Sequence, residues 1–287
     1  MKPSEIRLSV ALLTRNRPDS LNRCLQSLRS QSVQPFEVVI SDDSDPQWVG
    51  ETREIADRWD CRYITGSLRG LYPNRNRAAL ACEGTHIRTM DDDHVLPPGH
   101  FHQCLEAIAV DPQAIWTTGE LGYIDGKFYK KVETANQLSA SGVGIGITNP
   151  NDNWGIADGS TIYPRSIYDR GFRMLEDYGY GESFLEFGVY LYANGFRSRC
   201  IPGAYVEHYA EAITITRRPL SMYESRLYAS ICYNRYFQKN YFKFWRYLAS
   251  YSLRLSQKRN LMRYLPEMFA KIETRWGAIA SKTEQQQ

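Results

Sequence analysis

The sequence predicts an α/β fold: a sheet that is parallel in its first half, flanked by helices, with a C-terminal helical extension. Between residues 6 and 93, short apolar runs alternate with segments of helical periodicity, which is typical of βαβ units. Each apolar run ends in polar residues, and open α/β sheets bind ligands at that edge. From Arg217 onward, the spacing of apolar residues is helical throughout.

The first half supplies four predicted strands and two predicted helices. Residues 6–14 form an almost continuous apolar run, as expected for a strand that is covered on both faces. Pro18 lies near the first turn of the next helix, where Leu21 and Leu25 recur at helical spacing. The same criteria give strands at 36–41, 61–65 and 86–90, and an Ala-rich helix over 74–83.

After Asp93 the pattern becomes less regular. Asp125-Gly126 is a strong signal for a hairpin turn, and residues 133–158, rich in Gly, Ser and Asn, predict a long functional loop. The other predicted elements are a helix after Pro97-Pro98, a strand over 114–118, a helix over 184–194 and two short strands up to His208.

The composition excludes several classes of protein. Of the 287 residues, 43% are hydrophobic and 23% are charged, as in ordinary globular proteins. The six cysteines include no Cys-x-x-Cys pair, which argues against a zinc ribbon, a redox motif or a disulfide scaffold. No apolar stretch is long enough to span a membrane, and residues 1–9 contain no apolar core of signal-peptide length. We therefore expect a cytoplasmic protein, with the inner face of the cell membrane as a location to test.

Charge is distributed unevenly along the chain. Residues 217–287 hold 14 of the 35 Lys and Arg but only 4 of the 32 Asp and Glu, together with 14 of the 37 aromatic residues. This quarter carries a net charge of +10, whereas residues 1–216 carry −7. We therefore predict a catalytic domain over 1–216 and a basic, aromatic-rich helical extension over 217–287 that meets an anionic partner.

The strongest chemical signal is the run Asp91-Asp92-Asp93 at the end of a predicted strand. Adjacent carboxylates repel one another, and a cation or a ligand would neutralise them; the alternative is a solvated acidic turn. A second acidic strand end, Asp42-Asp43, is expected on the same edge, and Arg75 opens the intervening helix. Carboxylates, arginine and helix N-termini on one edge suit a diphosphate with a divalent cation.

These residues lie in stretches that the chain shares with a known family. The chain resembles family 2 glycosyltransferases over about residues 6–210, with the motifs in the family's order. The resemblance implies the mixed sheet of the GT-A fold, a nucleoside-diphosphate sugar donor, and a hexosyltransferase-type reaction with inversion. The matching stretches are 9–17, 38–44, 75–77, 91–93, 178–182 and 185–188.

The resemblance also implies roles for individual residues. Thr14 would lie near the nucleotide base and ribose, Asp43 would hydrogen-bond the base, and Asp91 would point toward the ribose. Asp93 and His208 would bind the divalent cation, Mn²⁺ or Mg²⁺, although a lone histidine is also common in a protein core. The residues implied for the donor site are Thr14, Asn16, Asp43, Arg75, Asp91 and Asp92.

An inverting transferase also needs a general base that deprotonates the acceptor hydroxyl. Glu182 and Glu186 are four residues apart at a predicted helix start and therefore share one face. The family's usual Glu-Asp pair is absent because Ser183 follows Glu182, and Tyr190 holds the place of a usual arginine. The base therefore stays open between the two glutamates, with Glu182 preferred; a plain helix-start carboxylate is the alternative.

The loop over 133–158 is predicted to cover the acceptor side. Trp154 would stack on a sugar face, or would be an ordinary buried aromatic residue. Asp158 is the next candidate for the base after the two glutamates. We expect the acceptor to be a saccharide or a lipid-linked molecule.

The C-terminal extension combines an aromatic stripe with a basic stripe. Such a helix would lie near anionic lipid, as a peripheral membrane element, or would pack on the catalytic domain with a solvated basic face. A homodimer interface is a further alternative. The aromatic stripe comprises Tyr233, Phe237, Tyr241, Phe244 and Leu248, and the basic stripe comprises Arg235, Lys239, Lys243 and Arg246.

Two other functional classes remain open from the sequence. The run from Asp91 to Val95 also fits the Asp-x-Asp-x-Val pattern of haloacid-dehalogenase-type phosphatases, in which the first aspartate is a nucleophile. The unusual segment around Glu182 leaves room for a nucleotide-sugar-binding relative without catalysis. The chain has no P-loop or dinucleotide fingerprint, and we expect no nucleic-acid partner.

Overall fold

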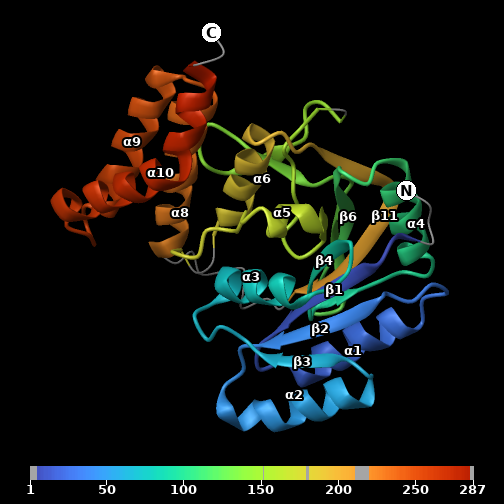
Figure 1. Ribbon diagram of the computed structural model, residues 1–287. Helices are drawn as coiled ribbons and strands as arrows, with labels where there is room; N and C mark the ends of the chain where they lie inside the picture. The colour runs from blue at the N-terminus through green and yellow to red at the C-terminus, as the bar shows by residue number, and fades with distance from the viewer. Residues whose placement is uncertain (1–4, 151, 179–180, 211–219, 285–287) are drawn as a thin grey trace.

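The computed structural model describes residues 5–150, 152–178, 181–210 and 220–284. A nine-stranded mixed sheet forms its centre, with helices on both faces, and the helices of the C-terminal quarter lie together at one side (Figure 1). This architecture confirms the predicted fold class.

The first half of the chain forms the parallel part of the sheet. Its elements are β1 (Leu8–Thr14), α1 (Pro18–Arg29), β2 (Glu37–Asp42), α2 (Pro46–Arg58), β3 (Arg62–Thr65), α3 (Leu71–Ala81) and β4 (His86–Asp91). The strands lie in the order β3-β2-β1-β4, all parallel. Each predicted strand is present, whereas α2 was not predicted.

β1 lies at the centre of two hydrophobic cores. The strand is buried along its whole length. Val10 and Leu12 pack into the cluster formed with α1 and α2, whereas Ala11 and Leu13 pack into the cluster formed with α3. The continuous apolar run in the sequence therefore reflects burial on both faces, as predicted.

The second half adds antiparallel and mixed pairings. Its elements are β5 (His94–Val95), α4 (His100–Val110), β6 (Ile115–Ile124), β7 (Lys127–Val132), β10 (Thr161–Pro164), α5 (Arg165–Asp169), α6 (Ser183–Ala193) and β11 (Ser198–Ala210). Asp125 and Gly126 both have positive φ, of 48° and 75°, so the predicted hairpin turn between β6 and β7 is confirmed. The two strands expected up to His208 are one strand, β11, with a register irregularity between Cys200 and Tyr205.

The loop predicted over 133–158 has more structure than expected. It contains a small antiparallel pair, β8 (Asn136–Leu138) and β9 (Gly144–Gly146). Between these strands the backbone carbonyl of Ala140 accepts hydrogen bonds from Ser230 Oγ and Asn234 Nδ2, both at 2.7 Å. The loop is thus attached to the C-terminal quarter of the chain.

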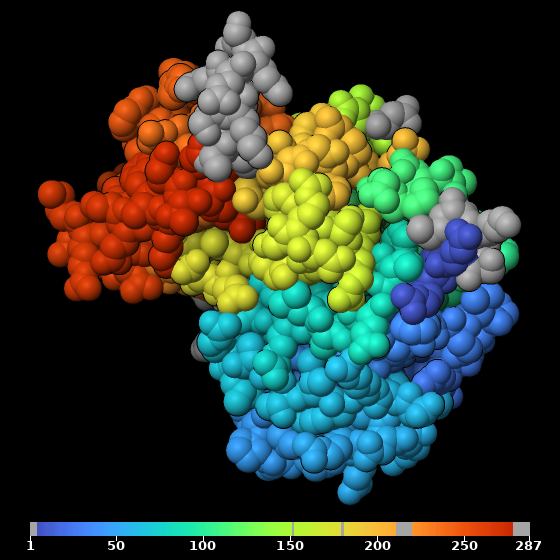
Figure 2. All heavy atoms as spheres, viewed as in Figure 1, coloured from blue at the N-terminus to red at the C-terminus, as the bar shows by residue number. Residues whose placement is uncertain are grey.

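The C-terminal quarter is helical, as predicted, and packs tightly on the rest. It comprises α8 (Leu220–Ile231), the π-helical segment η2 (Cys232–Phe237), α9 (Tyr241–Leu255) and α10 (Leu261–Glu284). Leu185 and Val189 of α6 share a hydrophobic core with Leu227 and Trp276 of these helices. Figure 2 shows the orange and red surface of the helices directly against the yellow surface of the preceding segments. The predicted boundary between 216 and 217 lies outside the described residues.

Candidate active site

The carboxyl ends of β1, β2 and β4 bring the predicted donor-site residues to one edge of the sheet. The strand register pairs Thr14 with Asp42 and Leu13 with Asp91, so the three strands end at nearly the same level. The acidic residues that follow β2 and β4 directly are Asp43, Asp92 and Asp93.

Asp92 is a buried residue at this edge that contacts Thr14 and Arg17. Its side chain is fully buried, Thr14 Oγ1 donates to Oδ2 at 2.8 Å, and Arg17 Nη2 lies 2.8 Å from Oδ1. Burial raises the pKa of Asp92 to about 7, although Arg17 acts in the opposite direction. We therefore revise the expected role of Asp92: it orients Thr14 and Arg17 and offers almost no surface to a donor.

Arg75 connects the strand edge to the loop over 133–158, which was predicted to cover the acceptor side. Its Nη2 lies 2.9 Å from Asp91 Oδ1 and 2.9 Å from Asp158 Oδ1, and the side chain is 1% exposed. Burial raises the pKa of Asp158 to about 6, and Arg75 opposes this shift. Within the described part of the chain, Arg75 Nε and Nη1 are buried and have no hydrogen-bond partner. Two N–H-bearing nitrogens of this arginine therefore lack a hydrogen-bond acceptor among the described residues.

Three potential metal ligands gather beside the acidic run. One ligand atom each from Asp93, His94 and His208 lies within 4.8 Å of the others. The antiparallel pairing of β5 with β11 places His94 directly opposite His208. Asp93 Oδ1 is buried and has no hydrogen-bond partner among the described residues. An unsatisfied carboxylate oxygen between two imidazoles fits a divalent cation.

The hydrogen bonds of the two histidines direct the same ring nitrogen to the cluster. His94 Nδ1 lies 3.1 Å from the Gly159 carbonyl oxygen, which can only accept, so Nδ1 carries the proton and Nε2 the lone pair. His208 Nδ1 lies 3.2 Å from Glu120 Oε1, and its Nε2 lies 3.6 Å from Asp93 Oδ2. Each histidine thus has an acceptor behind it that orients the ring.

The electrostatics of the cluster follow from these contacts. Burial lowers the pKa of His94. For His208, burial acts in the same direction, but hydrogen bonds to Asp93 and Glu120 outweigh it and raise the pKa to about 10. Without a cation, His208 is therefore protonated and balances the two carboxylates.

Asp43 and Asn16 shape the nucleotide end of the edge. Asp43 Oδ1 accepts from the Leu68 N–H at 2.8 Å, and a Cβ on Gly66 would come within 2.1 Å of this oxygen. Asn16 has φ 58°, and its side chain contacts Asp45 through both amide atoms. Asn16 therefore connects the end of β1 to the loop after β2, next to the predicted binding site of the nucleotide base.

The two candidate bases have different surroundings. Glu186 is fully buried; Arg275 Nε donates to Oε1 at 2.9 Å, and Trp276 Nε1 donates to the same oxygen at 2.7 Å. Glu182 directly precedes α6 at its N-cap position without a side-chain capping hydrogen bond; its side chain is 15% exposed and accepts from Arg226 Nη2 at 2.7 Å. We therefore revise the pair: Glu186 is buried against Arg275 and Trp276 of α10, and of the two glutamates only Glu182 has exposed side-chain surface. Gly179 and Tyr180 of the same motif lie outside the described residues.

Trp154 occupies a packing position. Its Nε1 donates to the Leu138 carbonyl at 3.1 Å, and its ring lies 5.3 Å from Tyr192 and 5.1 Å from Phe237. These contacts join the loop to α6 and η2. The structure thus favours the alternative of a packed aromatic residue over stacking on a sugar.

The aromatic stripe of the extension is divided between core and surface. Phe244 is buried, and Tyr233, Phe237 and Leu248 pack partly against the same core. Tyr241 is instead exposed. Further large apolar side chains of α9 and the start of α10 are exposed, namely Phe242, Trp245, Leu253 and Met262. All four members of the basic stripe are exposed as well.

Sequence reasoning missed three residues of this site. His94 directly follows the acidic run, but only the pairing of β5 with β11 shows that it faces His208. Arg17 lies in a matching stretch and contacts Asp92 and Asp93. Glu120 lies far from both in the sequence, and no local pattern marks it.

The architecture is that of the GT-A fold, as solved structures show. GalNAc-T7 with UDP, GalNAc and Mn²⁺ matches with 12% identity and a TM-score of 0.65, over 94% of this chain and 58% of that chain. TarS 1-349 of S. aureus in complex with UDP-GlcNAc matches with 14% identity and a TM-score of 0.59, over 98% of this chain and 93% of that chain. At these identities the likeness establishes the fold alone. No curated protein matches the sequence significantly.

The family follows from the sequence. The family model described as glycosyl transferase family 2 matches residues 9–172, more than half of the chain. The chain therefore belongs to glycosyl transferase family 2. This confirms the resemblance and the predicted enzyme class, and it shows that the phosphatase alternative is wrong. Among the described residues, no helix has both the length and the apolar character needed to span a bilayer.

Proposed function

We propose that this protein transfers a hexose from a uridine-diphosphate sugar to an acceptor hydroxyl, with inversion, and that the transfer depends on Mn²⁺. The observation that carries the proposal is the cluster of Asp93, His94 and His208 beside the strand ends near Arg75. Ligands for a cation thus lie next to a cationic group for a diphosphate. The UDP and UDP-GlcNAc named for the structures of similar fold support uridine as the nucleoside.

The ligand set favours Mn²⁺ over Mg²⁺. Mg²⁺ prefers oxygen ligands and retains several waters, whereas imidazole binds transition metals, and the Mn²⁺ named for the GalNAc-T7 structure supports Mn²⁺ among these. Asp93 Oδ1, His94 Nε2 and His208 Nε2 would hold the cation. When bound, the cation would neutralise charge on the diphosphate leaving group.

The chain's own residues would hold the remainder of the donor. Arg75 would donate from Nε and Nη1, which are buried without a hydrogen-bond partner in the described part of the chain, to the diphosphate. Asp43 Oδ1 accepts from Leu68, so we assign Oδ2 to an N–H of the uracil base. Thr14, fixed by Asp92, would face the ribose.

Glu182 is the general base that the geometry supports best. It lies at the N-terminal end of α6, where the helix dipole favours an anion, and Arg226 fixes its carboxylate. It would take the proton from the acceptor hydroxyl as that oxygen attacks the anomeric carbon opposite the diphosphate. Asp158, the second candidate, is instead paired with Arg75 on the donor side.

Two substitutions separate these roles. Glu182→Gln should lower the rate of transfer by about 10²- to 10⁴-fold and leave UDP affinity near the parental value. Asp158→Asn should weaken UDP binding as well, because Asp158 contacts Nη2 of Arg75 and so holds the guanidinium in place, while Nε and Nη1 stay free of hydrogen bonds to the residues that the structure describes. If Glu182→Gln transferred sugar at the parental rate, the base would have to lie elsewhere.

The exposed face of α9 supports peripheral membrane association. It presents Phe242 and Trp245 beside Lys243 and Arg246, a combination that suits the surface of an anionic bilayer. A saccharide on a lipid carrier would be an accessible acceptor for a protein held there. A homodimer that buries the same face is the competing account.

A nucleotide screen tests the proposed function as a whole. Thermal unfolding would be followed with UDP, GDP, CDP and dTDP, each with Mn²⁺, Mg²⁺ or EDTA. We expect the largest stabilisation from UDP with Mn²⁺, since a ligand that binds only the native state raises the unfolding temperature. Slow metal-dependent hydrolysis of the matching nucleotide sugar would establish catalysis, whereas binding without any turnover would support the inactive relative.

A further inference from the structure

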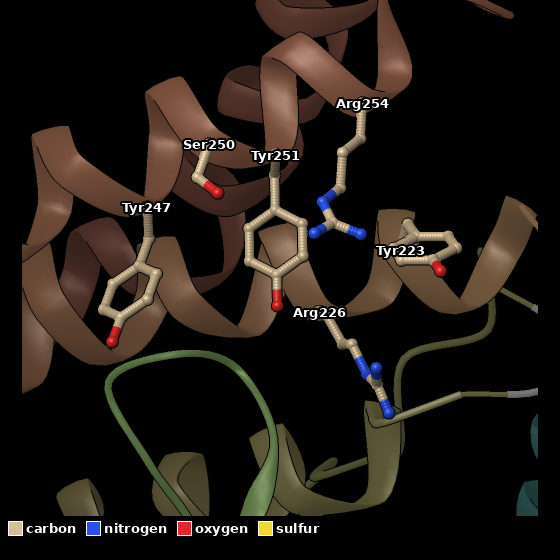
Figure 3. A pocket seen from close by; sticks show the side chains of 6 residues that line it. All are labelled: Tyr223, Arg226, Tyr247, Ser250, Tyr251 and Arg254. Atoms are coloured by element: carbon tan, nitrogen blue, oxygen red, sulfur yellow. The ribbon is translucent and has the colours of Figure 1, made fainter.

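A cationic cavity lies between α8 and α9, outside the donor site. Its volume is about 250 Å³, and three tyrosines, two arginines and a serine line it (Figure 3). The lining residues are Tyr223, Arg226, Tyr247, Ser250, Tyr251 and Arg254. None of them is acidic, so the cavity itself supplies only positive charge.

The two arginines differ in how far they are neutralised. Arg226 uses Nε and Nη2 to contact Glu182 Oε1, at 3.0 and 2.7 Å, and Nη1 lies outside this pair. The Arg254 guanidinium lies over the Tyr223 ring, 5.9 Å from its centroid. Within the described residues, no carboxylate oxygen lies within 4.0 Å of an Arg254 nitrogen. Arg254 therefore contributes a positive charge that has no anionic counterpart in the cavity.

Part of the cavity wall is held in place by contacts with the loop over 133–158. Tyr251 donates from its hydroxyl group to the Ser141 carbonyl at 2.7 Å. A Cβ on Gly142 would come within 2.1 Å of the Arg226 carbonyl oxygen, so the acceptor-side loop lies directly against α8. In Figure 3, Tyr247 and Tyr251 point the same way from α9, and the Arg254 guanidinium lies between Tyr251 and Tyr223.

The cavity adjoins the proposed base. Arg226 belongs both to the cavity lining and to the ion pair with Glu182. At Gly181, the residue before Glu182, the carbonyl accepts from the Tyr72 hydroxyl at 2.5 Å, and this hydroxyl lies 3.5 Å from Asp158 Oδ2. A molecule in the cavity would therefore lie beside the ion pair of Arg226 with Glu182.

We propose that this cavity binds an anionic group, a phosphate or a carboxylate, carried by the saccharide acceptor. The inference rests on the proposed function, because it names the class of acceptor for the same reaction. Arg254 and Nη1 of Arg226 would hold the oxygens of the anion, since guanidinium groups match the geometry of phosphate and carboxylate. The tyrosine rings would lie against the apolar face of a sugar and donate from their hydroxyl groups. The acceptor hydroxyl would thereby lie next to Glu182.

Calorimetric titration of the full chain tests this site directly. Saturating UDP and Mn²⁺ would first occupy the donor site. The probes are two matched pairs: glycerol 3-phosphate against glycerol, and methyl β-glucuronide against methyl β-glucoside. We expect at least one anionic probe to bind and its neutral partner not to bind; the pair that responds identifies phosphate or carboxylate as the anion.

Variants of the arginines provide the control. Arg254→Gln should weaken binding of the responding probe about tenfold or more, since it removes charged hydrogen bonds. Arg254→Lys should weaken it less. Arg263→Gln, on an 84% exposed arginine that pairs with Glu267, makes the same change of charge elsewhere and should bind as the parent does. Glu182→Gln should strengthen binding, because it releases Arg226 to the anion.

Three outcomes would overturn the proposal: no binding of either anionic probe, equal binding of the neutral partners, or parental affinity in Arg254→Gln. UDP affinity in the same samples distinguishes this failure from failure of the proposed function. If UDP affinity is parental and neither anionic probe binds, only the proposed anion site is contradicted. If the parent does not bind UDP, the proposed UDP-sugar donor is contradicted.

Discussion

His94 and His208 face one another across the antiparallel pairing of β5 with β11, with ring centroids 5.0 Å apart and an interplanar angle of 77°. Asp93, adjacent to His94 in the chain, completes the cluster. The strand pairing therefore fixes both imidazoles before any cation binds. Such preorganisation favours binding of a cation, because little conformational freedom remains to be lost on binding.

Glu120 should tune the metal site through His208, although it is not itself one of the proposed ligands. Its carboxylate accepts from His208 Nδ1, and we expect Glu120→Gln to lower Mn²⁺ affinity about 10- to 100-fold. The control is Glu106→Gln, which removes a carboxylate from the exposed pair with His102. Titration of the metal-free protein with Mn²⁺ measures both. Equal loss in the two variants would show that the contact behind His208 has no specific effect.

Mn²⁺ affinity should rise with pH. Burial lowers the pKa of His208, but Asp93 and Glu120 outweigh it and raise the pKa to about 10, so below that pH the cation must displace a proton. Affinity should then increase about tenfold per pH unit between about pH 7 and 9. In the metal-free protein the sign is opposite: the stabilisation from charged His208 is complete below about pH 6.5 and disappears as pH rises through about 10. A flat affinity profile would contradict the assignment of His208 as a ligand.

The fold should depend on Glu186 much more than on most surface carboxylates. Glu186→Gln leaves Arg275 without its carboxylate partner, and breaking a buried ion pair costs about 3 to 5 kcal/mol of unfolding free energy. Glu267→Gln, on an exposed carboxylate paired with Arg263, should cost less than about 1 kcal/mol. Urea unfolding measures both. Similar unfolding free energies for the two variants would contradict the role of Glu186 in anchoring α10.

The exposed face of α9 should bind anionic vesicles. Phe242 and Trp245 would enter the interface, and each nearby basic residue would add about 1 kcal/mol of attraction. Phe242→Ser with Trp245→Ser should reduce co-sedimentation, and high salt should reduce it for the parent because such attraction is screened. Sedimentation as a dimer without any lipid binding would instead favour the homodimer account.

The positions of the strands were predictable because their apolar runs report burial directly. Residues 8–14 are buried throughout, and a short continuous apolar run of this kind indicates a strand that is covered on both faces. The carboxylates after β2 and β4 were likewise predictable, since parallel strands end at one edge. The helix α2 carried a weaker signal: only Thr52, Ile55 and Ala56 are buried in it.

Other features depend on contacts between distant parts of the chain. Glu186 resembles a catalytic carboxylate in the sequence, and only its pairing with Arg275 shows that it is structural. Likewise, only the pairing of β5 with β11 shows that His94 lies opposite His208, since the two are 114 positions apart in the sequence. Local periodicity describes burial, but it does not describe which side chain meets which across a sheet or between helices.

Asp93 should hold a cation that links this protein to a nucleoside diphosphate, and UDP binding tests this role most directly. Calorimetry would compare the parent, Asp93→Ala and the control Asp111→Asn, whose aspartate pairs with Arg199, each with Mn²⁺ and with EDTA. We predict that the parent and Asp111→Asn bind UDP only with Mn²⁺, and that Asp93→Ala loses this dependence and most of the affinity. Parental UDP affinity of Asp93→Ala in the presence of Mn²⁺ would contradict the account.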